Sequence, residues 1–195
     1  MTRPTRTETA AATRTALLAA ASALFMKEGF AHTTINAIVR EAGFTRGAFY
    51  AHFTSKDDVL VCLVTSLADE ATPRLLKLIA ACTTGDQVIA AVSGWVAERS
   101  KSQDVALLIL DAARIGGRAT GDLPALLAAR WVEVGEAITA FFPDRDETLR
   151  PDEIVAIVVG LTYGPVGSGL TGHDPERLAS VALRAVLGRA RTHSV

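Results

Sequence analysis

The segment from Thr45 to Tyr50 contains several side chains whose chemistry suits hydrogen bonding to nucleic acid. Arg46 can donate two hydrogen bonds, to the O6 and N7 atoms of a guanine. Thr45 offers a hydroxyl or methyl group to a base or a phosphate, and Tyr50 can reach a phosphate or a thymine methyl group. Gly47 is small enough to let a helix lie close to the floor of a groove. The segment therefore predicts a short base-reading helix that begins after Thr45.

Side chains on either side of this segment suit contact with phosphate. Thr33 or Thr34 is expected to cap the preceding helix, whose unpaired first-turn N–H groups form an anion site. His52 and Lys56 follow the reader helix, where the DNA backbone would pass. His52 has no second histidine or carboxylate at metal-ligand spacing, so we interpret it as a phosphate neighbour. Phosphate contacts set the register of a protein on DNA, whereas base contacts select the sequence.

Two short helices are needed to position these side chains. The first carries apolar residues at spacings of three, four and seven, a single buried face; these are Ile35, Ile38, Val39 and Ala42. Gly43 ends it. Thr45 caps the second helix, Phe44 and Phe49 form a hydrophobic staple across its start, and Phe49 and Phe53 share its buried side. Two such helices joined by a glycine-containing turn form the helix-turn-helix pattern.

Helical periodicity continues through the rest of the chain, and alternating strand patterns are scarce. Apolar residues recur at helical spacing over residues 13–28. Ser55 and Asp58 form a capping box that opens a long helix, and Pro73 is expected to kink or break that helix. Four or five helices follow. The first of them is expected to be capped at Asp86, and the last one, capped at Asp174, follows a glycine-rich turn after Leu161. The sequence therefore predicts an all-α fold.

We expect this fold to have three parts. Residues 1–12 lack an apolar stripe and are interpreted as a flexible arm. Residues 13–54 form a three-helix DNA-binding domain with the helix-turn-helix, and residues 55–195 form a second helical domain. Residues 1–56 carry seven basic and three acidic side chains, whereas the remainder carries 13 basic and 18 acidic ones. This asymmetry suggests that only the N-terminal part meets phosphate.

The run from Thr33 to Leu60, TTINAIVREAGFTRGAFYAHFTSKDDVL, resembles the DNA-binding region of the TetR (tetracycline repressor) family of bacterial regulators. The resemblance extends back to about Arg14. Val39 stands where the family usually has a small alanine, and the C-terminal two thirds match the family in helical pattern only. The matching features, in order, are the Thr-Thr-Ile opening, Ala42-Gly43, Arg46-Gly47, Phe49-Tyr50, His52-Phe53 and Ser55-Lys56.

The resemblance implies a homodimeric, cytoplasmic transcriptional regulator whose partners are double-stranded operator DNA and a small-molecule effector. The last two helices of each subunit would form a four-helix interface, where Gly160 and Gly164 suit close packing. Residues 55–195 would bind the ligand, and ligand binding would shift the fourth helix. That shift would change the separation of two reader helices that must lie about 34 Å apart on a near-palindromic site, and so release the DNA.

Four side chains of the second domain are candidates for ligand binding. Arg99 falls on the apolar stripe of its helix, where it either pairs an acidic ligand or is a snorkelling or salt-bridged arginine near a helix C-terminus. Trp95 and Trp131 either line a pocket or pack in the core. Tyr163 is open to the same two interpretations.

Other classes of function find little support. The sequence has no nucleophile–base pair, no metal-ligand spacing and no nucleotide-binding loop, so we expect no enzyme, catalytic residue, metal or cofactor. Residues 154–172 are uncharged but not uniformly apolar, and the N-terminal region lacks the apolar stretch of a signal peptide, so no membrane association is expected. The main alternative is a DNA-binding regulator that is controlled by a protein partner or by no ligand, and an enzyme is a remote third.

Overall fold

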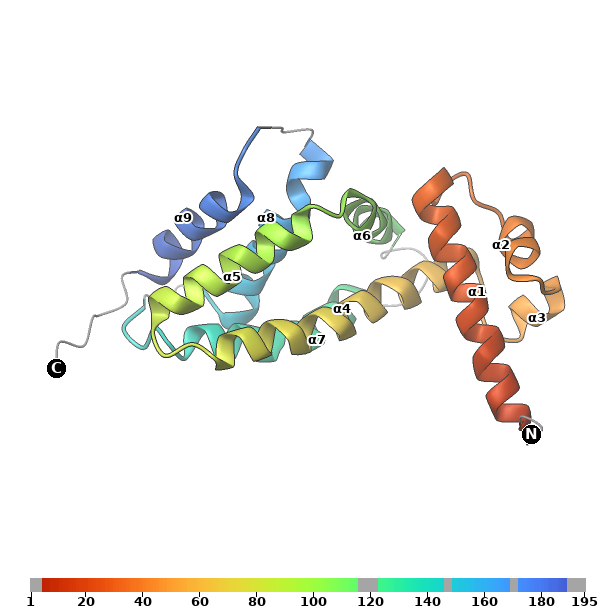
Figure 1. Cartoon of the computed structure of the whole chain (residues 1–195), viewed down its shortest axis with the longest axis horizontal. Helices are drawn as coiled ribbons and strands as arrows, with labels where there is room; N and C mark the ends of the chain where they lie inside the picture. The colour runs from red at the N-terminus through yellow and green to blue at the C-terminus, as the bar shows by residue number, and fades with distance from the viewer. Residues whose placement is uncertain (1–4, 116–122, 146–148, 169–171, 189–195) are drawn as a thin grey trace. The chain divides into compact units, whose positions relative to one another are not determined.

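The helical periodicity of the sequence is realised as nine helices in the part of the chain that a computed structural model describes, residues 5–115, 123–145, 149–168 and 172–188 (Figure 1). No strand occurs in those residues, and the all-α prediction is confirmed. The helices are α1 (Arg6–Glu28), α2 (Ile35–Ala42), α3 (Arg46–Tyr50), α4 (Lys56–Ala80), α5 (Gly85–Ser100), α6 (Gln103–Ile115), α7 (Leu123–Thr139), α8 (Pro151–Ser168) and α9 (Pro175–Leu187).

The chain divides into two compact units. The first comprises residues 1–65 and 108–123, and the second comprises residues 66–107 and 124–195. The division falls inside α4 and inside α6, so each of these helices contributes to both units. The boundary expected after residue 54 lies just before α4 begins, about three turns ahead of the division within that helix.

α1 begins inside the segment that the sequence predicted to be a flexible arm. The side chain of Thr5 accepts a hydrogen bond from the N–H of Glu8 at 3.3 Å, and the Glu8 carboxylate accepts one from the N–H of Thr5 at 2.6 Å. This capping box pairs two N–H groups that would otherwise lack partners and fixes the first turn. The flexible-arm prediction therefore does not hold for residues 6–12, while residues 1–4 lie outside the described part.

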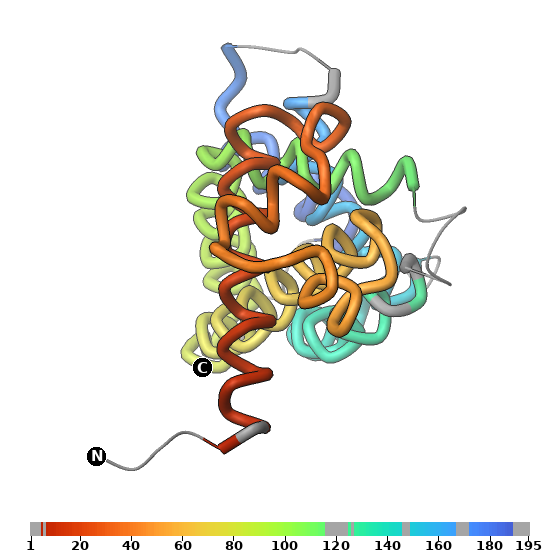
Figure 2. Tube along the Cα trace, turned by 90° about the vertical axis from the view of Figure 1, so that its right-hand side faces the viewer, coloured from red at the N-terminus to blue at the C-terminus, as the bar shows by residue number. Residues whose placement is uncertain are grey.

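The apolar side of α1 forms the core of the first unit, where α1 lies beside α2 and α3 (Figures 1 and 2). Leu17 and Ala21 are fully buried, and the ring of Phe25 meets that of Phe30 edge-on, with 5.1 Å between centroids. By length and composition alone α1 is apolar enough to cross a membrane, contrary to the expectation that the N-terminal region lacks an apolar stretch. Only 28% of the 18-residue window that passes this test is buried in the fold, on the side that carries Leu17, Ala21 and Phe25.

Two prolines lie inside helices that the sequence predicted to be interrupted. α4 continues through Pro73, so the helix is not broken there, and α8 continues through Pro165 where a glycine-rich turn was expected after Leu161. A proline removes one helical hydrogen bond. Around Pro73 the helix is held on both sides by packing, because Ala71 and Leu75 are both buried. Tertiary packing thus outweighs the local preference.

The N-cap of α9 is the residue that the sequence predicts, whereas the N-cap of α5 is a different one. Asp174 accepts hydrogen bonds from two first-turn N–H groups of α9, as predicted. α5 is capped by Thr84, which accepts a hydrogen bond from the N–H of Gln87 at 3.3 Å, and not by Asp86 as the sequence suggested. Asp86 instead forms an ion pair with Arg184 of α9, a partner that its local sequence does not reveal.

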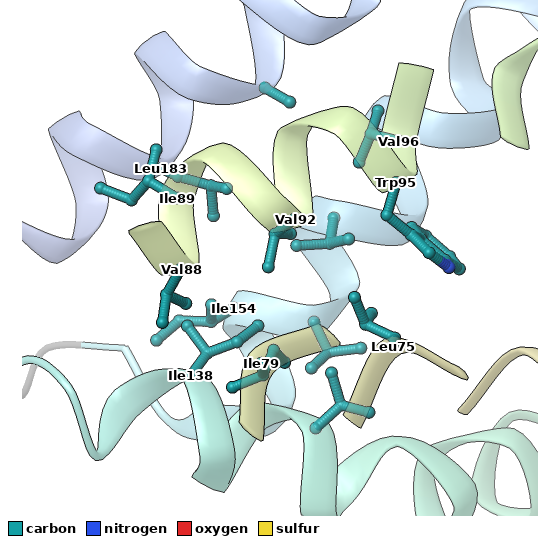
Figure 3. Close-up of a cluster of buried hydrophobic side chains, with 14 of the residues drawn as sticks. Leu75, Ile79, Val88, Ile89, Val92, Trp95, Val96, Ile138, Ile154 and Leu183 are labelled. Carbon is teal, nitrogen blue, oxygen red and sulfur yellow. The ribbon is translucent and has the colours of Figure 1, made fainter. Parts of the chain in front are cut away.

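The second unit is built around α5, which packs against α8 and α9. Val88 and Val92 of α5 point into a cluster that also receives Ile138 of α7 and Ile154 of α8 (Figure 3). Each of these side chains is at most 1% exposed. Trp95 lies at one end of the same cluster, so the core reaches as far as the predicted ligand residues.

Candidate nucleic-acid interface

α2 has the start, buried face and end that its sequence predicts. Its cap is Thr34, whose hydroxyl oxygen accepts a hydrogen bond from the N–H of Ala37 at 3.1 Å. Ile38 and Val39 are buried. Gly43 ends the helix with φ of 73°, a left-handed conformation that glycine adopts without the steric cost borne by other residues. The turn into α3 therefore depends on glycine at this position.

α3 is only five residues long and is held by the two aromatic side chains on its inner side. Thr45 caps it by accepting a hydrogen bond from the N–H of Ala48 at 3.2 Å. Phe49 and Phe53 are at most 2% exposed, and their ring centroids lie 5.6 Å apart. The predicted inward positions of both rings are confirmed.

The opposite side of α3 is exposed, as a reader helix requires. Thr45, Arg46 and Gly47 are exposed, and Tyr50 is 50% exposed. The guanidinium group of Arg46 donates a hydrogen bond to the Tyr50 hydroxyl at 3.4 Å and lies 5.9 Å from the centre of its ring. No acidic side chain of the described residues pairs with Arg46, so its donors stay available to a base edge.

Thr33 is unsuited to the phosphate contact predicted for it. Its side chain is 1% exposed, and its hydroxyl group donates a hydrogen bond to the carbonyl oxygen of Gly29 at 2.9 Å. The backbone N–H of Thr33 also donates to Gly29, at 3.2 Å. Thr33 therefore closes the end of α1. Thr34, which is exposed, retains the predicted position at the start of α2.

Lys56 lies within the first unit and contacts backbone carbonyl groups. Its ammonium group donates hydrogen bonds to the carbonyl oxygens of Phe30 at 2.6 Å and Thr33 at 2.8 Å, and it lies 4.2 Å from the centre of the Phe30 ring. Burial lowers the pKa of Lys56 below its ordinary value, against the opposing influence of Asp57 and Asp111. These contacts tie the start of α4 to the α1–α2 connection, and a phosphate contact by Lys56 stays a prediction.

His52 is half-buried beside Phe53, with 6.4 Å between ring centroids. It lies two residues after the end of the reader helix. Among the residues that the structure describes, no group of three or more His, Cys, Asp or Glu side chains is placed to hold a metal ion. A phosphate contact by His52 stays a prediction.

Sequence reasoning assigned no role to Arg14, which supports the reader helix from behind. Its guanidinium group lies 5.1 Å from the centre of the Phe53 ring and donates a hydrogen bond to the sulfur of Cys62 at 3.2 Å. Burial raises the pKa of the Cys62 thiol, although Arg14 acts in the opposite direction. The signal for Arg14 was present in the sequence, because it lies three residues before the buried Leu17 and therefore beside it on the surface of α1.

The four ligand candidates come together in the second unit. The rings of Trp95 and Trp131 meet edge-on with 6.0 Å between centroids. Arg99 lies 5.8 Å from the centre of the Trp95 ring, and it donates a hydrogen bond to the Tyr163 hydroxyl at 3.4 Å. Residues from α5, α7 and α8 thus form one cluster of aromatic rings around a cation.

Comparison with known proteins agrees with this geometry. The family model described as "Bacterial regulatory proteins, tetR family" matches residues 17–62. The HTH-type transcriptional regulator YerO of Bacillus subtilis is 55% identical over 38 residues, which are 20% of this chain and 13% of YerO. The regulator UidR of Escherichia coli K12 is 25% identical over 190 residues, covering 93% of this chain and 94% of UidR. The local match with YerO thus spans about an eighth of its length.

Solved structures resemble the chain over nearly its full length. A TetR-family transcriptional regulator from Pectobacterium atrosepticum superposes with a TM-score of 0.65 at 22% identity, covering 96% of this chain and all of that one. The helix-turn-helix and its exposed reader face define a DNA-binding regulatory protein. Residues 17–62 carry the DNA-binding region described by the TetR family model, and the chain resembles regulators of that family over nearly its full length.

Replacing Lys56 separates its two possible roles. Lys56→Ala should lower the free energy of unfolding by about 1–2 kcal/mol, because two carbonyl groups lose a charged donor. Its binding to duplex DNA should keep the wild-type slope of log affinity against log salt, since a lost phosphate contact would flatten that slope by about one unit. Urea unfolding and fluorescence anisotropy measure the two effects, with the exposed Lys27→Ala as control. A flatter salt dependence with an unchanged free energy of unfolding would show that Lys56 contacts phosphate.

Proposed function

We propose that this protein regulates transcription by binding a near-palindromic operator through α3. The exposed face of α3 carries the proposal, because it presents hydrogen-bond donors on a helix of the TetR type whose other side is buried. Arg46 and Tyr50 would select the sequence. The remaining proposed DNA contacts are Thr34, Thr45, Gly47 and His52. The proposed role is not enzymatic, and it places the protein in the cytoplasm with its DNA.

A two-fold operator calls for a dimer, and the second unit offers a surface for one. α9 exposes apolar side chains at a spacing of three and seven, directly opposite its buried face; these are Leu178, Val181 and Ala185. α8 exposes Gly160 and Gly164, and a Cβ atom added at either glycine would meet nothing within 4 Å. Helices of a second subunit could therefore approach α8 closely and cover the stripe of α9.

A small molecule bound in the second unit would control this DNA binding. α4 is one continuous helix that contributes to both units, so a ligand that shifts its second-unit part would also act on its first-unit part. Ligand and operator would then favour different arrangements of the same dimer, and each would weaken the binding of the other. Trp95, Arg99, Trp131 and Tyr163 are the proposed ligand contacts. The effect of the ligand would be release, so the regulator would be a repressor.

Base reading by α3 is tested at Arg46. Arg46→Ala should weaken binding to the selected operator by about 1–3 kcal/mol and relax base preference at one position in each half-site. Selection of random duplexes by the purified protein, followed by sequencing, measures both the operator and the altered preference. Arg74→Ala, which removes an exposed arginine of the second unit, is the matched control. Unchanged preference in Arg46→Ala would mean that another residue reads the operator.

The dimer surface is tested by a charge on the exposed stripe of α9. Val181 is 58% exposed in the single chain, so Val181→Glu should fold normally but place an unpaired carboxylate in the interface, at a cost of several kcal/mol. We expect a monomer by light scattering and loss of operator binding. Leu107→Glu on α6, at a side chain that is 52% exposed, is the matched control and should remain dimeric. A dimeric Val181→Glu would exclude α9 from the interface.

Control by a small molecule is tested by joining two measurements on the same compounds. Compounds that raise the melting temperature of the protein should also raise the dissociation constant of the operator complex, because they stabilise the arrangement that does not fit DNA. Thermal-shift screening followed by anisotropy on operator DNA gives both values. Stabilising compounds that leave operator affinity unchanged would favour the alternative, a regulator controlled by a protein partner.

A further inference from the structure

We infer that the ligand bound by the second unit is a carboxylate with an apolar body, and that Arg99 recognises its charged group. The inference deepens the proposed function and rests on it, since it concerns the same ligand site. It is carried by the surroundings of the Arg99 guanidinium group, which in the described part of the chain provide aromatic rings and one phenol but no negative charge.

The hydrogen bonding of Arg99 is incomplete. Its Nε atom is buried and has no hydrogen-bond partner. One terminal nitrogen donates to the Tyr163 hydroxyl at 3.4 Å, which is long for such a bond. A guanidinium group has five N–H donors in a planar fork. Most of this fork is therefore without a protein acceptor among the described residues, and a planar anion with two oxygens would complete it.

The charge of Arg99 is also uncompensated within the described residues. The neighbouring Glu98 pairs with Lys101 at 2.5 Å, and the arginines of the second unit that form ion pairs do so elsewhere, as Arg130 does with Asp69 and Arg184 with Asp86. Among the carboxylates that the structure describes, none lies within 4 Å of a nitrogen of Arg99. Arg99 is half-buried, and removing even part of a cation from water without a counter-charge is unfavourable. A bound anion relieves this cost, and the low polarity around it strengthens the attraction.

The apolar part of the ligand follows from what surrounds the guanidinium group. Trp95 is 8% exposed and Tyr163 is 6% exposed, and Trp131 meets Trp95 edge-on. Trp95 also belongs to the hydrophobic core that Figure 3 shows. A ligand whose carboxylate meets Arg99 would therefore place its remaining atoms against aromatic rings. Such a wall favours an aryl or alkyl group over a sugar or a polyamine.

An arginine in the last turn of a helix also has a purely structural explanation. Arg99 lies in the last turn of α5, where any cation interacts favourably with the helix dipole. Lysine would serve that role equally well, because only a positive charge is required. Recognition of a carboxylate by a planar fork is different, since lysine cannot supply two parallel donors. The two explanations therefore predict different behaviour for Arg99→Lys.

The experiment uses the full chain without DNA and reads out the site directly. Trp95 and Trp131 are the two tryptophans of the sequence, so intrinsic tryptophan fluorescence reports on this cluster alone. The probes are 4-phenylbutyrate and octanoate, each titrated beside its uncharged primary amide. We expect each acid to quench or shift the fluorescence and to bind at least about tenfold more tightly than its amide, as a charge-assisted hydrogen-bonded pair predicts.

Variants then assign the effect to Arg99. Arg99→Gln should reduce the affinity for each acid to that for its amide, and Arg99→Lys should recover only a small part of the difference. Arg74→Gln, at an exposed arginine of the same unit, should behave as wild type. Melting curves of all variants verify folding. If Arg99→Lys binds both acids with full wild-type affinity, a positive charge alone is sufficient, and recognition by the planar guanidinium group is overturned.

Three further results would overturn the inference: equal affinity for acid and amide, an unchanged affinity for the acids in Arg99→Gln, or no response to either acid up to its solubility limit. Release of DNA is not part of this measurement. Acids that bind through Arg99 but leave the operator complex intact would support the inference and contradict the proposed ligand control. Operator release by uncharged compounds alone would support the proposed ligand control and contradict the inference that the ligand is a carboxylate.

Discussion

The DNA-facing surface depends on the burial of two phenylalanine rings. A helix of five residues, the length of α3, closes too few hydrogen bonds to be stable by itself. Phe49 and Phe53 bind it to the first unit, and the guanidinium group of Arg14 lies against the Phe53 ring. Because the inner face is held in this way, the outward direction of Arg46 and Tyr50 is determined as well. The chemistry of the exposed face thus rests on packing on the opposite face.

Lys56 extends this constraint to the long helix that follows. Its hydrogen bonds to the carbonyl oxygens of Phe30 and Thr33 join the first turn of α4 to the connection between α1 and α2. Under the proposed function, a ligand-induced shift of α4 would act on that connection without an intervening flexible segment. A lysine that contacts phosphate would have no such effect. Under the proposed function, the position of Lys56 therefore contributes to regulation as well as to stability.

Much of the DNA-binding unit could be predicted because the interactions that shape it are local. Capping by Thr34 and Thr45, the glycine stop at Gly43 and the inward phenylalanines all involve residues within a few positions of one another. The capping box of Thr5 and Glu8 was equally local, and the T-x-x-E pattern was present in the sequence although an arm was expected there. Helix continuity through the prolines was not predictable, because packing from distant residues decided it.

By itself the sequence determined an all-α protein, the two faces of its reader helix and the resemblance to TetR regulators, since periodicity, caps and motif spacing are written in neighbouring residues. Only the tertiary structure decided the surroundings of individual polar side chains. Lys56 meets carbonyl groups 23 and 26 residues away, and Arg99 meets a hydroxyl group 64 residues away. The physical reason is that the cost of burying a charge depends on which groups the fold brings near it, and periodicity carries no information about them.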